Sequence, residues 1–177
     1  MSTTPPIAAD TTTATTWRLD PARSSVEFQV PHFWGLMKVK GSFSEYEGIL
    51  ALGAAPSASL TIDAASVNTK QGKRDQHLRS KDFFNVEHHP KITFTSDSAS
   101  LDGEALTVRG TLHVAAGQLP LALDATLRPV GEEFEIEASA PVDQRQLGIT
   151  WSPLGVTRTP SVLTVKGRLV RADTPAA

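Results

Sequence analysis

Alternation of apolar and polar residues constrains the fold of this chain more than any other feature of its sequence. In residues 106–114 every second position is Leu, Val or Gly, and Thr, Arg or His occupies the positions between. A period of two is typical of a β-strand with one apolar face and one solvated face. The same alternation returns in about nine segments, at residues 26–30, 36–43, 45–52, 59–63, 91–97, 106–114, 119–127, 134–140 and 163–169.

The connections between these segments are short. Asp102-Gly103 and Ala116-Gly117 are turn sequences between neighbouring strands, so consecutive strands are expected to pair antiparallel. The fold class predicted is all-β, an eight-stranded antiparallel barrel. An interior of this size is either filled by side chains or holds one slender ligand. Gly110 and Gly167 inside strands indicate a bend or a close approach. The alternation alone does not distinguish a barrel filled by side chains from one that holds a ligand.

One long segment departs from the β pattern. Residues 66–96 turn polar and charged for about a dozen positions before alternation resumes. Good helix formers predict a short helix over residues 71–81. A helical excursion in an all-β chain is expected to plug or cover one end of the barrel.

Composition excludes several classes of function. Seventeen basic against 19 acidic residues give a net charge of −2, so no nucleic-acid partner is predicted. The chain has no cysteine, which rules out disulfides and thiolate chemistry, and it has no apolar run long enough to form a transmembrane segment. His88 and His89 are adjacent and, in an extended segment, point to opposite faces, so no metal site is predicted.

The two ends of the chain differ from its middle. Residues 1–16 are rich in Thr, Ala and Pro, and residues 172–177 are similar, so both are predicted to be disordered tails around one domain at 17–171. The N-terminus lacks the basic and apolar regions of a secretory signal. A cytoplasmic location is therefore expected.

Several linked motifs resemble one known family, the YceI-like, polyisoprenoid-binding family. They begin with Trp17 and Asp20, continue through a Val-x-Phe-x-Val-x-His strand ending at His32, and include the block at residues 66–94. Later blocks match at Val108-x-Gly110-x-Leu112 and at Arg145-Gln146-Leu147-Gly148. The resemblance covers residues 17 to about 170. The tryptophan-containing segment at 150–155 and the missing signal sequence depart from the pattern of many relatives.

The resemblance implies a lipocalin-like barrel that encloses a long isoprenoid chain, such as a polyprenyl phosphate or an isoprenoid quinone. It also implies carriage rather than catalysis, a bound lipid with no required cofactor, and a homodimer. Arg74, His77 and Arg79 are the residues predicted to contact the headgroup at the barrel mouth. The competing interpretation is a solvated helix face on which Asp75 pairs with Arg79. The residues predicted to line the cavity are Phe28, Val30, Trp34, Phe43, Phe83, Phe84, Phe94, Leu112, Leu123 and Trp151.

Phe83 and Phe84 are neighbours, so an extended segment would point one ring inward and the other outward. Two further functional hypotheses stay open at this point. One is an enzyme or redox accessory acting on a quinone or amide, with His77 and Asp75 as acid and base. The other is a stress-response interaction module whose barrel is filled by its own side chains. No catalytic motif is present, and the chain is predicted not to be an enzyme.

Overall fold

The computed structural model describes residues 14–32, 37–149 and 160–173 and confirms the predicted all-β barrel with one short helix. The elements, in chain order, are β1 (Thr15–Leu19), η1 (Pro21–Arg23), β2 (Ser25–His32), β3 (Met37–Phe43), β4 (Tyr46–Leu52), β5 (Ser57–Asp63), η3 (Ala64–Ser66), β6 (Val67–Asn68), α1 (Gly72–Arg79), β7 (Lys91–Asp102), β8 (Ala105–Val114), β9 (Gly117–Val130), β10 (Glu133–Val142), η4 (Gln144–Leu147) and β11 (Ser161–Arg171). β1 begins two residues before the predicted domain boundary at residue 17.

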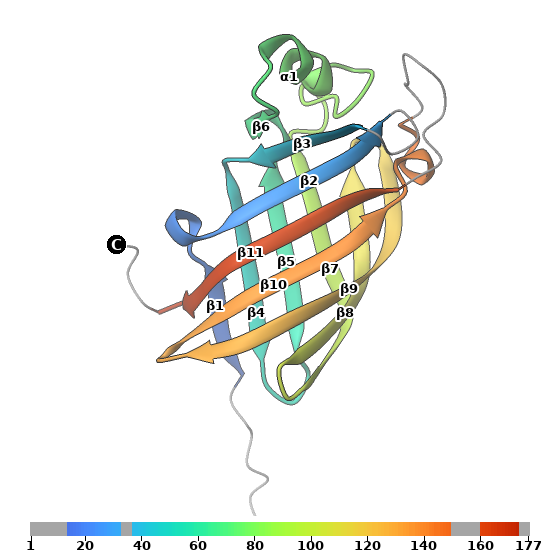
Figure 1. Cartoon of the computed structure of the whole chain (residues 1–177). Helices are drawn as coiled ribbons and strands as arrows, with labels where there is room; N and C mark the ends of the chain where they lie inside the picture. The colour runs from blue at the N-terminus through green and yellow to red at the C-terminus, as the bar shows by residue number, and fades with distance from the viewer. Residues whose placement is uncertain (1–13, 33–36, 150–159, 174–177) are drawn as a thin grey trace, which may run out of the picture.

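Eight continuous strands close the barrel, although the described residues contain eleven separate strand segments. The sheet runs β1-β4-β5-β7-β8-β9-β10-β11, and β11 pairs again with β1. β2 continues β1 along the same edge of β11, because Leu19 pairs with Leu169 and Val26 pairs with Val165. β3 and β6 extend β4 and β5 in the same way. Three of the eight strands are therefore long strands with a break in the middle (Figure 1).

Short 3₁₀ turns produce two of these breaks. The Asp20 carboxylate accepts a hydrogen bond from Ala22 N at 3.0 Å, and Pro21 follows at the first position of η1. Arg23 then donates two hydrogen bonds of 2.9 Å to Glu133 at the start of β10. The Arg23 guanidinium lowers the pKa of Glu133 and also that of Asp20. The first break is thereby anchored to β10, which lies beyond β11 in the sheet.

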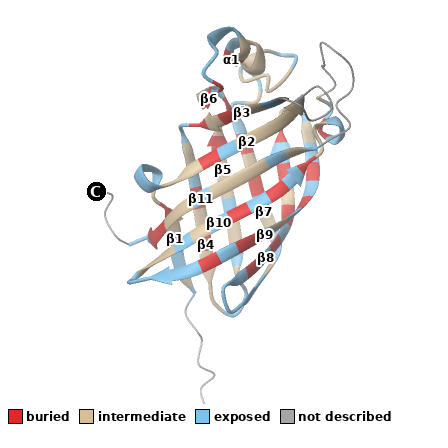
Figure 2. Cartoon of the chain, in the orientation of Figure 1, coloured by how far each residue is buried: buried red, intermediate tan, exposed pale blue. Residues whose placement is uncertain are grey.

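The predicted alternation places one set of side chains inside the barrel and the other set on its outer surface. Along β8 and the second half of β10 buried and exposed residues alternate, as the banding of Figure 2 shows. The buried side chains form one hydrophobic cluster inside the barrel. Gly110 lies where β8 meets a bulge in β7 between Ser96 and Ser98. A Cβ at residue 110 would lie 2.2 Å from Thr95 O, so the close approach predicted for this glycine is made by backbone.

The helix covers one end of the barrel. α1 spans 72–79, slightly shorter than the predicted 71–81, and lies beyond β3 and β6 (Figure 1). It ends where Ser80 N donates to His77 O. Turns over residues 81–88 then lead the chain back to β7. The helix and the turns after it therefore stand at the entrance to the barrel.

Candidate functional site

An apolar cavity of about 140 Å³ occupies the end of the barrel beneath α1. Strands β2, β3, β5, β7, β8, β10 and β11 contribute inward side chains, α1 contributes Leu78, and η4 contributes Leu147. The lining residues are Phe28, Val30, Phe43, Ile62, Leu78, Phe83, Phe84, Ile92, Leu112, Val114, Val142, Gln144, Leu147, Ile149, Ser161, Val162 and Leu163.

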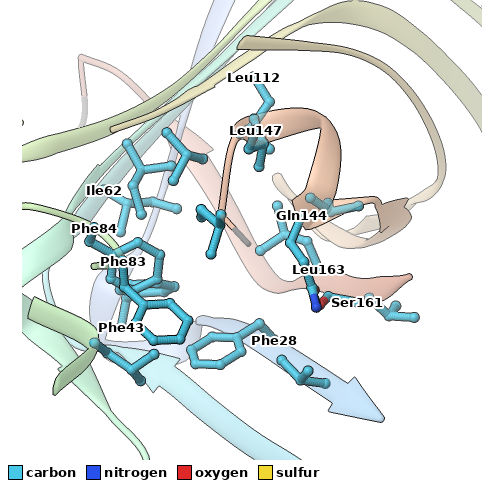
Figure 3. Close-up of a pocket in the computed structure, with 17 residues that line it drawn as sticks. Phe28, Phe43, Ile62, Phe83, Phe84, Leu112, Gln144, Leu147, Ser161 and Leu163 are labelled. Carbon is cyan, nitrogen blue, oxygen red and sulfur yellow. The ribbon is translucent and has the colours of Figure 1, made fainter. Parts of the chain in front are cut away.

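Aromatic rings form one side of this cavity. Phe28 and Phe43 have ring centroids 5.5 Å apart, and those of Phe43 and Phe84 are 6.0 Å apart. In Figure 3 these rings and that of Phe83 gather together, with Leu147 on the facing side. Phe28 lies across Gly41 of the neighbouring strand, with which it is paired. Glycine at 41 therefore sets how far this ring stands from the centre of the barrel.

Polar groups are few in the lining. Among the described lining residues only Gln144 and Ser161 are polar, and the Ser161 hydroxyl donates a hydrogen bond to Gln144 Oε1. The Asp143 side chain caps η4 by accepting from Arg145 N at 3.1 Å, which positions Gln144 at the first turn. Arg145 holds the pKa of Asp143 below its usual value through the side-chain hydrogen bond between them.

A second apolar chamber of about 90 Å³ lies deeper in the barrel. Phe94 and Leu123 line it, together with residues of β1, β4, β5 and β8. Leu163 lines both chambers. The two spaces therefore follow one another along the barrel, with side chains between them.

Eight of the ten predicted lining residues thus face one chamber or the other. Phe28, Val30, Phe43, Phe83, Phe84 and Leu112 line the first chamber, and Phe94 and Leu123 line the second. Trp34 and Trp151 lie outside the described residues. Whether any of the ten contacts a ligand stays a prediction.

The expectation that Phe83 and Phe84 point to opposite sides is wrong. Both rings line the first chamber. The rule of opposite faces applies to an extended strand, and residues 81–84 form a turn instead. Phe83 N donates to Ser80 O at 3.1 Å and Phe84 N donates to Leu78 O at 3.0 Å, so the backbone curls back on the helix end.

The arginines predicted for the headgroup bond to the chain itself. Arg74 donates to Thr69 Oγ1 at 2.7 Å and to Thr69 O at 2.8 Å. Arg79 donates to Ala65 O at 2.8 Å and to Val67 O at 3.0 Å. These bonds fasten α1 to the end of β6. Neither arginine lines the apolar cavity, and their contact with a headgroup stays a prediction.

Asp75 does not form the pair with Arg79 considered from the sequence. Its carboxylate is buried at 7% exposure and accepts hydrogen bonds from the backbone N–H and the hydroxyl of Thr69. His77 lies elsewhere, with Nε2 3.7 Å from Asp82 and its ring edge-on to Phe83 at 5.2 Å. His77 does not line the cavity either. The structure therefore does not join His77 and Asp75 in an acid–base pair.

Several lining residues escaped the sequence interpretation. Leu78 carried a usable signal, because it is the one apolar side chain in the sequence GKRDQHLR of α1 and so marks the face that packs inward. Leu147 lay within the resemblance block but carries no alternation, since η4 is not a strand. Gln144 had no signal from periodicity.

The described residues form neither a metal-binding cluster nor a membrane-spanning helix. Within residues 14–32, 37–149 and 160–173, no three histidine or acidic side chains come together in a way that could hold a metal ion. In the same described part of the chain, no helix is both long and apolar enough to traverse a bilayer.

Comparison with known sequences identifies one family. The profile of the YceI-like domain family matches residues 17–169. A UPF0312 protein of Pectobacterium atrosepticum is 36% identical to this chain over 112 residues, which covers 61% of this chain and 58% of that protein. Protein YceI of Escherichia coli O157:H7 is 35% identical over the same length and coverage. The matched region therefore spans less than two thirds of these curated relatives.

Solved structures share the fold. The crystal structure of BcnA from Burkholderia cenocepacia superposes with a TM-score of 0.75 at 19% identity and covers 86% of this chain and 99% of that one. A YCEI protein of Campylobacter jejuni gives a TM-score of 0.68 at 25% identity, covering 82% and 91%. A polyisoprenoid binding domain from Saccharophagus degradans, implicated in plant cell wall breakdown, gives 0.68 at 16% identity, covering 89% and 98%.

The family profile starts at Trp17 in β1 and ends at Leu169 in β11, the two strands whose pairing closes the barrel. The match therefore takes in the whole barrel, with the apolar cavity inside it. This chain belongs to the YceI-like domain family.

Proposed function

We propose that this protein binds and carries a long-chain isoprenoid lipid, a polyprenyl phosphate or an isoprenoid quinone, inside its barrel and without a catalytic step. The observation that carries the proposal is the first chamber, which is lined almost wholly by aliphatic and aromatic side chains and is followed by a second apolar chamber. Membership of the YceI-like family, and the fold shared with a polyisoprenoid binding domain, support it.

The affinity would come from burial of the tail. Each methylene that leaves water contributes about 0.8 kcal/mol. A branched isoprenoid chain presents apolar groups on all sides, and the lining offers two polar side chains that already bond to each other. The quality of the lining therefore matches a hydrocarbon tail better than a polar small molecule.

The chambers are small for such a tail. The first chamber has about 140 Å³ and the second about 90 Å³, whereas pockets for drug-sized ligands are roughly 300–1,000 Å³. A long chain therefore requires side chains to move apart. The rings at the helix end and the side chain of Leu163, which borders both chambers, are the groups expected to move.

The proposal is tested by native mass spectrometry of the freshly purified protein, followed by organic extraction of any bound molecule. We expect an added mass that, after extraction, proves to be a lipid built from isoprene units. Protein that carries nothing is then offered farnesol, polyprenyl phosphates and menaquinones. No uptake of any of them would overturn the carrier proposal and favour a barrel filled by its own side chains. The homodimer and the cytoplasmic location stay predictions.

A further inference from the structure

A larger, polar pocket opens beside the apolar cavity. It has a volume of about 440 Å³ and lies between the segment 81–89, the β8–β9 turn and η4. Phe83, Leu147 and Ile149 line both this pocket and the apolar cavity. The two spaces therefore share part of their walls, and one is a polar space outside the barrel while the other is an apolar space within it.

Backbone geometry builds the two walls of this outer pocket. Asn85 takes a left-handed conformation with φ of 49°, and its carbonyl accepts from His88 N at 3.1 Å and from His89 N at 2.8 Å. This tight turn sets the position of His89. On the opposite wall, a Cβ on Gly117 would lie 2.3 Å from Leu147 O, so the β8–β9 turn packs backbone to backbone against η4.

The charged side chains of the outer pocket differ in whether they interact with a neighbouring residue. The Asp82 carboxylate is directed to His77, whose Nε2 is 3.7 Å away. Lys81 and His89 line the pocket, and within the described residues neither side chain makes a hydrogen bond or an ion pair. The pocket therefore offers an ammonium group and an imidazole that have no partner among the described residues, next to the entrance of an apolar cavity.

The two arginines of α1, in contrast, are both hydrogen-bonded within the chain. The Arg74 and Arg79 guanidiniums each donate two hydrogen bonds to oxygens of residues 65–69. These bonds hold both guanidiniums against residues 65–69, and neither arginine lines the outer pocket. Lys81 lines that pocket, is exposed and is bonded to no described residue.

We infer that the outer pocket receives the anionic headgroup, phosphate or carboxylate, of an amphiphile whose tail lies in the barrel, with Lys81 and His89 as the contacting residues. The inference rests on the proposed function, because it requires a tail in the apolar cavity. The ligand passes between Phe83 and Leu147, so its charged end stays hydrated while the tail is desolvated.

The test compares three ligands that share one tail and differ in the headgroup: farnesyl phosphate, farnesoic acid and farnesol. Binding to the full chain is measured by titration calorimetry below the aggregation concentration of each ligand. The wild type is expected to prefer the two anionic ligands. Lys81→Gln is expected to weaken farnesyl phosphate about fivefold to tenfold and to leave farnesol within about twofold.

Lys73→Gln is the matched control, because Lys73 is an exposed lysine on α1 that does not line the pocket. It removes the same charge and is expected to change no affinity by more than about twofold. His89→Gln tests the second contact and should also reduce the preference for the anionic ligands.

Three results would count against the inference. Equal affinity of the wild type for farnesol and farnesyl phosphate would overturn it, and so would an unchanged preference in Lys81→Gln. Equal losses in Lys81→Gln and Lys73→Gln would assign the effect to overall charge and would also overturn it. Failure of the wild type to bind any of the three ligands is a different outcome, since it would remove the proposed function itself.

Discussion

The substitution Gly41→Ala tests how the aromatic side of the cavity is held. Gly41 lies in β3 opposite Phe28 of β2, and the Phe28 ring covers it. A Cβ at residue 41 would lie 2.3 Å from Phe28 Cζ and 2.5 Å from Phe28 Cε1. Such distances are far inside van der Waals contact, so the ring must move. The atoms concerned form the far end of a side chain, so it can move by rotation.

The available space decides where the ring goes. The first chamber has about 140 Å³ and is bordered by Phe28, and an apolar cavity of about 150 Å³ is known to accept a benzene molecule. The ring is therefore expected to swing into the chamber and fill it. The strained rotamer and the weakened contact with Phe43 cost about 1–2 kcal/mol of folding free energy.

The substitution should reduce the affinity for a ligand more than it reduces the free energy of unfolding. A ring in the chamber excludes the part of the tail that would occupy it. Loss of three or four buried methylenes corresponds to about 3 kcal/mol, or about a hundredfold in affinity. The change is measured as the affinity for farnesol by titration calorimetry, together with the free energy of unfolding in urea.

Gly72→Ala serves as the control for this substitution. It makes the same chemical change at the start of α1, where no atom lies within 4 Å of the added Cβ. It should leave farnesol binding unchanged and should not reduce stability. A folded Gly41→Ala protein that binds farnesol as tightly as the wild type would refute the reasoning. A loss of stability above about 4 kcal/mol would also refute it, since the ring would then have had no space to enter.

Three further substitutions test other parts of the structure. Gly110→Ala places Cβ 2.2 Å from a backbone oxygen, which cannot rotate away, so we expect a loss of more than about 3 kcal/mol in urea unfolding, and a loss below about 1 kcal/mol would contradict this. Thr69→Val removes the hydroxyl that donates to Asp75 and accepts from Arg74, and it should cost about 2 kcal/mol and speed amide exchange in α1, whereas unchanged exchange would count against the tether. Glu133 has a lowered pKa in the folded state, because Arg23 bonds to it, so its contribution is full above the usual value of 4.5 and disappears as the pH falls through the lowered pKa. The stability difference between the wild type and Glu133→Gln should therefore shrink below about pH 4.5, and a difference that stays constant down to pH 2 would exclude this linkage.

Local periodicity explains why so much of the fold was predictable. A strand with one face inward must carry an apolar residue at every second position, as β8 does from Leu106 to Val114. The sequence also identified the segment that leaves the barrel, because α1 and the turns after it lack alternation. These features depend on neighbours in the chain, and a pattern of neighbours is what a sequence displays directly.

The division of three strands into halves was not predictable in the same way. η3 was not expected, although Asp63 caps it by accepting from the backbone N–H group two residues later, as Asp20 does in η1. Whether such a turn ends a strand or only interrupts it depends on the partner strand. The long β11 pairs with both β1 and β2, and this pairing makes the two segments act as one continuous strand of the barrel.

The residues of the candidate site were likewise predictable only in part. The sequence by itself determined which side chains are apolar and inward, and eight of the predicted lining residues do face the two chambers. Only the tertiary structure decided that Phe83 and Phe84 face the same way, because the turn at 81–84 depends on hydrogen bonds to the end of α1.

The tertiary structure likewise decided the use of the cations. Arg74, Arg79 and Lys81 lie within eight residues in the sequence and are equivalent there as positive charges. In the fold, two of them bond to oxygens of residues 65–69, and the third lines a pocket at the cavity entrance. A charge is a property of the residue, but whether it has a partner depends on groups brought close by folding, and for that physical reason the sequence alone could not distinguish them.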